Sequence, residues 1–364
     1  MASQEKIMSF PHIGNYHVAI EFLLKHVLEN IQVLTPPPIT KKTLELGSKY
    51  SPDFVCVPFK YNLGNYLEAL EQGANILVQS GGGCRFGYYG EIQEQILRDL
   101  GYDFEFISLI DNEKVNPLAF FNRFKRLNPQ LSLARFAYYF QLTFKMIEAM
   151  DSLDHMIRSN IGFAVREGSF ELLHKEFLRE LAAVEGFRSL DKLYRKYDAL
   201  FRQLEVNKPD NPLRVGIVGE LYTLMEPFSS CFIEKELAKK GIQVTRFITV
   251  SYLLRHHPQS SDLLKLAGNY LEYEIGADGT DSVARAKMLA EAGYDGVIHV
   301  KPFGCTPEVN SMPMLQNISN DYKMPILYFS FDAQTSETGV LTRLEAFHDM
   351  LMMRREANRW QNVI

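Results

Sequence analysis

The chain lacks both a long apolar run and an excess of basic residues. No stretch of its 364 residues reaches the roughly 18 consecutive apolar residues that a membrane-spanning helix needs. Residues 1–16 also lack the apolar core of a signal peptide. With 39 basic and 44 acidic residues the formal net charge is −5, which gives no general attraction to nucleic acid or acidic lipid. We therefore expect a cytoplasmic protein that binds neither nucleic acid nor a membrane.

Cysteine is also scarce. The four cysteines are Cys56, Cys84, Cys231 and Cys305, and no two of them form a CxxC pair. Their spacing excludes a zinc ribbon and a ferredoxin-type run of ligands. Because thiols are kept reduced in the cytoplasm, we expect four free thiols and no disulfide.

The arrangement of apolar segments predicts two α/β domains joined by helices. Residues 1–116 and 206–364 alternate short apolar strands with amphipathic helices that stop at glycine, which favours parallel sheets. Residues 117–205 carry apolar side chains at three- to four-residue spacing and few turn signals. We expect helices and no strand in this middle region.

One pattern occurs twice in the chain. The two copies are "LEALEQGANILVQSGGGC" and "AKMLAEAGYDGVIHVKPFGC". Each contains a helix, a glycine stop, an acidic or amide residue, an apolar strand, a short loop and a cysteine. The cysteine follows the glycine by 11 residues from Gly73 to Cys84 and by 12 from Gly293 to Cys305. Both thiols are thus predicted just past a parallel strand, where open α/β sheets hold ligands.

A third cysteine is predicted at the same end of the first sheet. Cys56, in "VCVPFK", is expected to follow a strand of the first domain. If the two sheets face a central cleft, Cys56, Cys84 and Cys305 meet in it. Three thiolates and one open position describe a site-differentiated iron–sulfur cluster, whose sulfurs the neighbouring glycine backbone could approach. The alternative is that these are buried packing residues beside glycine loops that any α/β protein contains.

Cys231 has a different setting. It lies near the predicted start of the amphipathic helix "CFIEKELAKKG", after two serines. We predict a packing or cap-region thiol there and not a metal ligand.

Several motifs together resemble the 2-hydroxyacyl-CoA dehydratase and benzoyl-CoA reductase superfamily, in particular its CoA-protein activase subgroup. The motifs are "FPHIGNY", "VCVPFKYNLGNY", "SGGGCRFGYYGE", "GELYTLMEPFSSCFIEKEL", "KPFGCTPE" and "SFDAQTSETGVLTRLEAFHDML". The resemblance spans nearly the whole chain, is weakest in the helical region, and is most specific in the last two motifs.

The resemblance implies two Rossmann-like domains with a 4Fe–4S cluster in the cleft between them. By motif, Cys56, Cys84 and Cys305 match the three ligand positions, and the fourth iron is open to substrate or solvent. The family's electron donor is a separate, homodimeric ATPase of the ASKHA type. This chain has no ASKHA nucleotide signature, so it is expected to accept the electron. Three convincing cysteines favour a single cluster over a double cubane.

Charged residues near the predicted ligands are candidates for catalysis or binding. Lys60 and Lys301 each lie four residues from a cysteine, where a cation would stabilise an anionic cluster and raise its potential; the alternative is a solvated lysine. Arg85 and Glu308 flank cysteines and could contact a substrate, unless they are surface or cap residues. Glu220 follows the strand "RVGIVG" and is expected to face the cleft.

These observations lead to one functional hypothesis and two alternatives. The chain would accept a low-potential electron from an ATP-dependent activase, under anaerobic conditions, and reduce or dehydrate a small molecule or CoA thioester at the open iron. It would then be a lyase- or reductase-type iron–sulfur enzyme or a subunit of one, alone as a dimer or with a related subunit. The alternatives are a non-catalytic iron–sulfur electron carrier or scaffold, and a structural zinc–thiolate protein.

Overall fold

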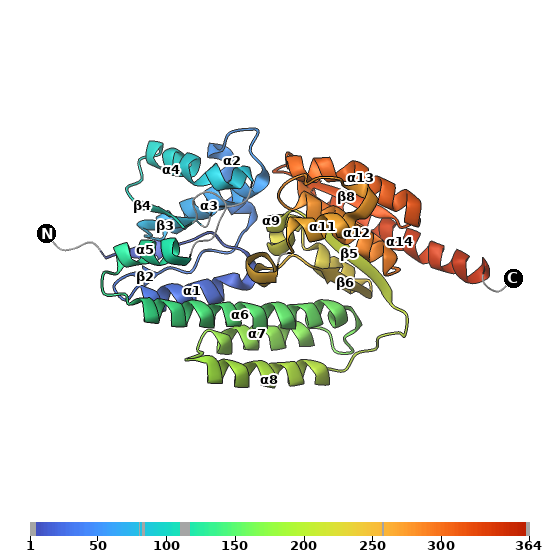
Figure 1. The fold of residues 1–364 in the computed structure, drawn as a ribbon, viewed down its shortest axis with the longest axis horizontal. Helices are drawn as coiled ribbons and strands as arrows, with labels where there is room; N and C mark the ends of the chain where they lie inside the picture. The colour runs from blue at the N-terminus through green and yellow to red at the C-terminus, as the bar shows by residue number, and fades with distance from the viewer. Residues whose placement is uncertain (1–4, 80, 82–83, 110–116, 257, 362–364) are drawn as a thin grey trace. The chain divides into compact units, whose positions relative to one another are not determined.

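The computed structural model describes residues 5–79, 81, 84–109, 117–256 and 258–361. The chain forms two compact units (Figure 1). Unit 1 comprises Met1–Ala149 and Phe177–Tyr194, and unit 2 comprises Met150–Glu176 and Arg195–Ile364. Each unit holds one four-stranded, entirely parallel sheet, which confirms the predicted α/β class with two Rossmann-like domains.

The sheet of unit 1 is built from short strands. They are β1 Ile7–Ser9, β2 Gln32–Val33, β3 Ile76–Gln79 and β4 Glu105–Ser108. Their order in the sheet is β2-β1-β3-β4. Met8 pairs with Ile76 across β1 and β3, which fixes the register of the two central strands.

Helices cover both faces of this sheet, in two apolar cores (Figure 1). The helices are α1 His17–Val27, α2 Lys41–Tyr50, α3 Val57–Glu71, α4 Tyr89–Asp99 and α5 Pro117–Leu127. Ile76 and Val78 pack with α1 and α5, whereas Leu77 packs with α3 and α4. This alternation is what a strand buried on both faces requires. Residues 7–27, which form β1 and α1, were not predicted as elements from the sequence.

The sheet of unit 2 has longer strands. They are β5 Leu213–Gly219, β6 Ile242–Arg246, β7 Gly296–Pro302 and β8 Ile326–Phe331. Their order, β6-β5-β7-β8, repeats the order of the first sheet. Val215 pairs with Gly296 across the two central strands, β5 and β7.

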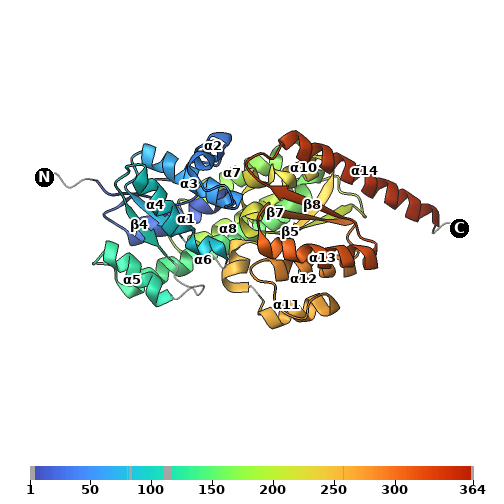
Figure 2. The same ribbon diagram turned by 90° about the horizontal axis from the view of Figure 1, so that it is seen from above.

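Two helical layers enclose the sheet of unit 2 (Figure 2). The elements are α9 Leu221–Met225, α10 Ile233–Lys239, α11 Ser260–Ala267, α12 Gly279–Glu291, α13 Thr306–Tyr322 and α14 Glu337–Gln361, with a five-residue π-helix at Tyr252–His256. Helices α11, α12 and α13 share one core with Val297 of β7. Helices α10 and α14 lie on the other face (Figure 2), where Phe347 and Leu351 of α14 approach Gly296.

The predicted helical region is helical in the structure. It contributes α6 Leu133–Asn160, α7 Ser169–Leu181 and α8 Phe187–Gln203, after α5. Among the described residues of 117–205 no strand occurs, apart from a single bridge between Ala164 and Val206. Each of these three helices begins in one unit and ends in the other.

The sequence repeat corresponds to a structural repeat. Gly73 and Gly293 both have a positive φ, at +97° and +68°, and each ends the helix before a central strand. Two residues later, Asn75 Oδ1 accepts the backbone N–H of Ile7 at 2.9 Å, and Asp295 Oδ2 accepts that of Arg214 at 2.8 Å. The equivalent side chains therefore fasten the helix turn to the first strand of each sheet, and β3 and β7 occupy the same place.

No helix among the described residues is long and apolar enough to cross a membrane.

Candidate functional site

Cys56 caps the helix that crosses over to the central strand of unit 1. It is the N-cap of α3 with extended φ and ψ, and Pro58 lies in the first turn, where a missing N–H costs nothing. The prediction that Cys56 follows a strand is therefore wrong, because the apolar run begins a helix and residues 53–54 before it form a turn. Since α3 runs back to the start of β3, its N-terminus lies at the carboxyl edge of the sheet.

Two glycines let α3 pack closely on α2. A Cβ atom at Gly64 would lie 1.9 Å from the Thr43 carbonyl oxygen, and one at Gly47 would lie 1.7 Å from that of Lys60. Thr43 also donates a hydrogen bond of 2.7 Å to buried Glu68 on α3, and its side chain completes a capping box with Thr40, the N-cap of α2. These contacts fix α3, and with it Cys56.

Cys84 lies at the same edge of unit 1. It is the N-cap of a 3₁₀ turn, η2 Arg85–Tyr88, that leads directly into α4, and its sulfur accepts the Phe86 N–H at 3.4 Å. Tyr89, the first residue of α4, places its hydroxyl 2.8 Å from the sulfur of Cys56. Burial, reinforced by Cys56, raises the pKa of Tyr89, so the phenol keeps its proton and can donate it to the sulfur. Residues 84–89 thus contain one thiol of unit 1, that of Cys84, and the tyrosine that contacts the other, that of Cys56.

Cys305 occupies the corresponding place in unit 2. It is the N-cap of α13, its backbone is extended, and Pro307 lies in the first helical turn. The same arrangement, a cysteine N-cap followed by proline two residues later, occurs at Cys56 and Pro58. The C-x-P pattern is visible in the sequence, but its meaning depends on both segments starting a helix at a sheet edge.

Cys231 is held in a different environment. It ends a 3₁₀ turn, η4 Pro227–Ser230, in the left-handed conformation, and is not a helix N-cap. Burial, and to a smaller extent Glu337, raises the pKa of its thiol to about 11. The thiolate needed for metal binding is therefore disfavoured at this position.

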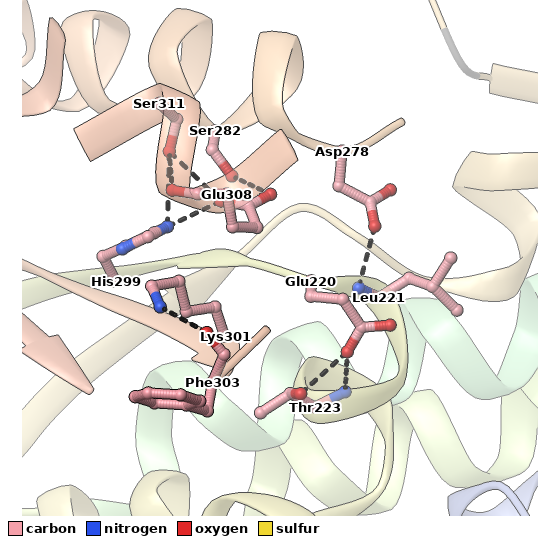
Figure 3. A network of polar contacts seen from close by, with 10 residues as sticks. All are labelled: Glu220, Leu221, Thr223, Asp278, Ser282, His299, Lys301, Phe303, Glu308 and Ser311. Atoms are coloured by element: carbon pink, nitrogen blue, oxygen red, sulfur yellow. Dashed lines mark hydrogen bonds and ion pairs between the residues drawn. The ribbon is translucent and has the colours of Figure 1, made fainter. Parts of the chain in front are cut away.

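A buried polar network surrounds Glu308, in the first turn of α13 and three residues after Cys305 in sequence (Figure 3). Glu308 is fully buried, and its carboxyl group lies 2.6 Å from His299 Nε2 and accepts a hydrogen bond of 3.1 Å from Ser282. Ser311 donates to the Glu308 carbonyl oxygen at 2.8 Å. The network fastens the start of α13 to β7 and α12, because His299 and Ser282 belong to those elements.

Two further carboxyl groups lie at the end of β5 (Figure 3). Glu220 accepts the N–H groups of Tyr222 and Thr223 at 3.0 and 2.9 Å, and so caps α9. Asp278 accepts the N–H of Leu221 at 3.0 Å. Burial raises the pKa of Glu220, helped by Glu308, and raises that of Asp278 well above its usual range, helped by Glu220 and Glu308. Both carboxyl groups therefore hold a proton more readily than they would in water.

Lys301 completes the group of ionisable residues in unit 2. Its side chain is buried at the end of β7, and its ammonium donates a hydrogen bond of 3.5 Å to the Phe303 carbonyl oxygen (Figure 3). Burial lowers the pKa of Lys301, while Cys305 and Glu308 act in the opposite direction. Of the candidates chosen from the sequence, Glu220, Lys301 and Glu308 are therefore assembled at one edge.

The remaining charged candidates belong to unit 1. Lys60 is half-buried in the first turns of α3, and Arg85 is exposed on the turn after Cys84, close enough to Tyr89 to affect its pKa. Three important residues, Asp278, His299 and Tyr89, were not singled out in the sequence. The one available signal was a histidine and a lysine two residues apart in the otherwise apolar strand "GVIHVKP", which places them on one face.

The three N-cap thiols fit the donor set of an iron–sulfur cluster. None is sealed in a core, and each stands at the start of a helical turn, where unpaired N–H groups favour a thiolate and an anionic cluster. The described residues contain no group of three or more His, Cys, Asp or Glu that could hold a metal ion. Cys56 and Cys84 belong to unit 1, and Cys305 to unit 2.

Comparison with known proteins gives a match in the second half of the chain. Residues 176–351 match the family model described as 2-hydroxyglutaryl-CoA dehydratase, D-component. The matched segment contains Cys305 and the whole network around Glu308, whereas Cys56 and Cys84 lie before it. No curated protein matches the chain in sequence. The family match places this chain in the 2-hydroxyacyl-CoA dehydratase superfamily.

Proposed function

We propose that the chain is a dehydratase-like iron–sulfur protein in which Cys56, Cys84 and Cys305 hold a single 4Fe–4S cluster. The strongest support is a structural setting that these three cysteines share and that the fourth cysteine lacks. Each is an accessible helix N-cap at the loop that an α/β sheet uses for ligands, while Cys231 is not.

When bound, such a cluster supplies one-electron chemistry at low potential and an iron open to a substrate. The chain's own residues would tune and shield it. Tyr89 would donate a hydrogen bond to the sulfur of Cys56, and the N–H of Phe86 would do the same for Cys84. We propose an ATP-dependent activase as the electron donor, consistent with the family, and a small molecule or CoA thioester as the substrate.

The polar network of unit 2 favours an enzyme over a simple electron carrier. Burying Glu220, Asp278 and Lys301 costs free energy. A simple electron carrier has no need of such buried ionisable groups. Reduction or dehydration moves protons as well as electrons, and buried carboxyl groups whose pKa is raised by burial are suited to donate protons. We assign this role to Glu220 and Asp278, with Lys301 as an electrostatic partner.

Three thiols also argue against a structural zinc site. Structural zinc is almost always held by four protein ligands, whereas three ligands and an open position suit chemistry at the metal.

Anaerobic reconstitution tests the proposal directly. Wild-type protein should bind about four irons and four sulfides per chain, as one 4Fe–4S cluster requires, and show a reducible EPR signal. The variants C56A, C84A and C305A should each lose iron, and C231A, the matched control, should keep it. Wild-type protein without iron after reconstitution, or the same iron content in all four variants, would disprove the ligand set.

A further inference from the structure

Lys301 is a buried cation without a counterion. Three Lys or Arg side chains are buried in the described part of unit 2, and they are Arg158, Arg246 and Lys301. Arg158 and Arg246 each pair with a carboxylate, at 3.9 and 2.9 Å. The ammonium of Lys301 forms no ion pair with the described residues and donates only to the Phe303 carbonyl oxygen, at 3.5 Å (Figure 3). Burying a charge without a partner costs much free energy, so this position calls for a partner from outside the chain.

The strand register places Lys301 next to the end of β5. Lys301 lies four residues after Val297 on β7, so both side chains point to the face that α12 and α13 cover. Gly219 pairs with Val300 across β5 and β7, and the N–H of Glu220 donates to the Val300 carbonyl oxygen at 3.1 Å. The backbones of Glu220 and Lys301 therefore lie side by side at the carboxyl edge of the sheet.

The ends of β5 and β7 are also where an α/β sheet usually binds ligands. The chain leaves β5 toward α10, on one face of the sheet, and leaves β7 into α13, on the other (Figure 2). Ligands bind outside the carboxyl ends of the strands at such a point, because the two connections diverge. Phe303 and Gly304, which directly follow β7, are exposed, so this edge reaches solvent within unit 2.

The acidic groups at this edge do not supply the missing negative charge. Glu308 acts on Lys301 electrostatically, but its carboxyl group is engaged by His299 at 2.6 Å. Burial raises the pKa of Glu220 and that of Asp278, so each holds a proton more readily than in water and can donate it in a hydrogen bond. A cation beside carboxyl groups that retain protons complements an oxyanion.

We propose that Lys301 binds a carboxylate or phosphate group of the substrate at the carboxyl edge of the sheet in unit 2. The inference deepens the proposed function and rests on it for the identity of the ligand as a substrate. The anion site itself consists of residues of unit 2 and needs no iron. A lysine suits this role because its ammonium carries three donors on a flexible stem and can turn from the Phe303 carbonyl oxygen to a ligand.

Urea unfolding of the iron-free, full-length chain tests the site. Acetate and inorganic phosphate, each compared with chloride at equal ionic strength, should raise the urea midpoint of wild-type protein, because a ligand that binds only the folded state stabilises it. The concentration dependence gives the affinity. In K301M the affinity should fall at least about tenfold, as for the loss of a hydrogen bond between charged groups. K265M, the control, removes an exposed lysine that pairs with Asp262 and should respond like wild type.

The stability of the variant without added anion separates binding from a structural role. K301M removes an unpaired buried charge and keeps an unbranched apolar side chain, so it should be at least as stable as wild type in chloride. K301Q, which is polar but uncharged, provides the same comparison if K301M does not fold. A less stable variant that responds to the anions like wild type would overturn the inference and make Lys301 a structural residue.

The two probes distinguish the sources of the anion. A response to acetate alone indicates a carboxylic acid substrate, and a response to phosphate alone indicates a phosphate-bearing one; both support the site. Equal stabilisation of wild type and K301M by either probe would overturn it, because the effect would then not involve Lys301.

Measurements on the reconstituted protein separate this inference from the proposed function. If K301M lowers the reduction potential but leaves the response to both anions unchanged, Lys301 is the counterion of the cluster and the anion site is wrong. If wild-type protein binds no iron but its response to the anions depends on Lys301, the anion site stands and the iron–sulfur function fails.

Discussion

Units 1 and 2 have the same order of strands but carry different functional groups at the carboxyl edges of their sheets. In both sheets the third strand follows a glycine-terminated helix and leads to a cysteine. The strands of unit 1 have two to four residues, and those of unit 2 have five to seven. The carboxyl edge of unit 1 carries two thiols and a tyrosine, whereas that of unit 2 carries one thiol and buried ionisable groups.

The comparison shows that the same strand order holds a cysteine segment in two different ways. Gln79 and His299 occupy equivalent positions in the central strands, four residues after Asn75 and Asp295. Gln79 donates to a carbonyl oxygen in the turn of Cys84, and His299 contacts the carboxyl group of Glu308. A buried polar residue thus fastens the cysteine segment in each unit, through an amide in one and through a carboxyl group in the other.

The largest effect is expected from Glu308→Ala in unit 2. The substitution leaves His299 Nε2 and the Ser282 hydroxyl buried without their partner, at 1–3 kcal/mol for each group, so about 4 kcal/mol of unfolding free energy should be lost. Urea unfolding measures the loss. Glu308→Gln keeps the shape and much of the hydrogen bonding and should cost less; an unchanged unfolding free energy in Glu308→Ala would show that the network does not stabilise unit 2.

Gly64→Ala tests the equivalent support in unit 1. The added Cβ would lie 1.9 Å from the Thr43 carbonyl oxygen, so α2 and α3 must separate, at about 2 kcal/mol. Gly339→Ala is the control, because its Cβ meets only Ser336 at 3.8 Å and alanine favours a helix. Equal unfolding free energies for the two variants would contradict the close contact between α2 and α3.

The two units should differ in pH dependence because the raised carboxyl pKa values belong to unit 2. A carboxyl group whose pKa is higher in the folded state contributes stability below its ordinary pKa of about 4, and this is lost as pH rises through the folded value. Asp278→Asn should therefore make the urea midpoint less dependent on pH above about pH 4. The exposed control Asp262→Asn should retain the wild-type dependence, and identical curves for the two variants would be inconsistent with the buried Asp278.

The smallest perturbation is chemical labelling of the thiols. With a pKa of about 11, Cys231 is about one-thousandth thiolate at pH 8, against about a quarter for an ordinary thiol, so iodoacetamide should label it about a hundredfold more slowly than exposed Cys84. Peptide mass spectrometry of iron-free protein measures both rates. Rapid labelling of Cys231 would remove the physical distinction between this cysteine and the other three.

The sequence was informative wherever a signal is local. The helix stops at Gly73 and Gly293 and the repeat leading to two cysteines depend on neighbouring residues, and the structure contains both features. The strand expected before Cys56 was wrong for a local reason too. A short apolar run fits a strand or a buried helix equally well, and Pro58 in a first helical turn decides between them.

The polar network could not be predicted, because its members are distant in the chain. Asp278 bonds to Leu221, which lies 57 residues earlier, and Cys56 meets Tyr89 across 33 residues. Such contacts exist only after the strands have taken their order and the crossover helices have returned to the sheet. No local pattern fixes that order.

By itself, the sequence determined the two α/β segments, the four thiols and the duplicated path to Cys84 and Cys305, because glycine stops, apolar alternation and spacing act over a few residues. Only the tertiary structure decided that Cys56 begins a helix at a sheet edge and that the pKa of the Cys231 thiol is raised. It also decided that buried carboxyl groups lie together at the carboxyl edge of the sheet in unit 2. Those properties depend on burial, and burial is created when segments far apart in the chain pack together.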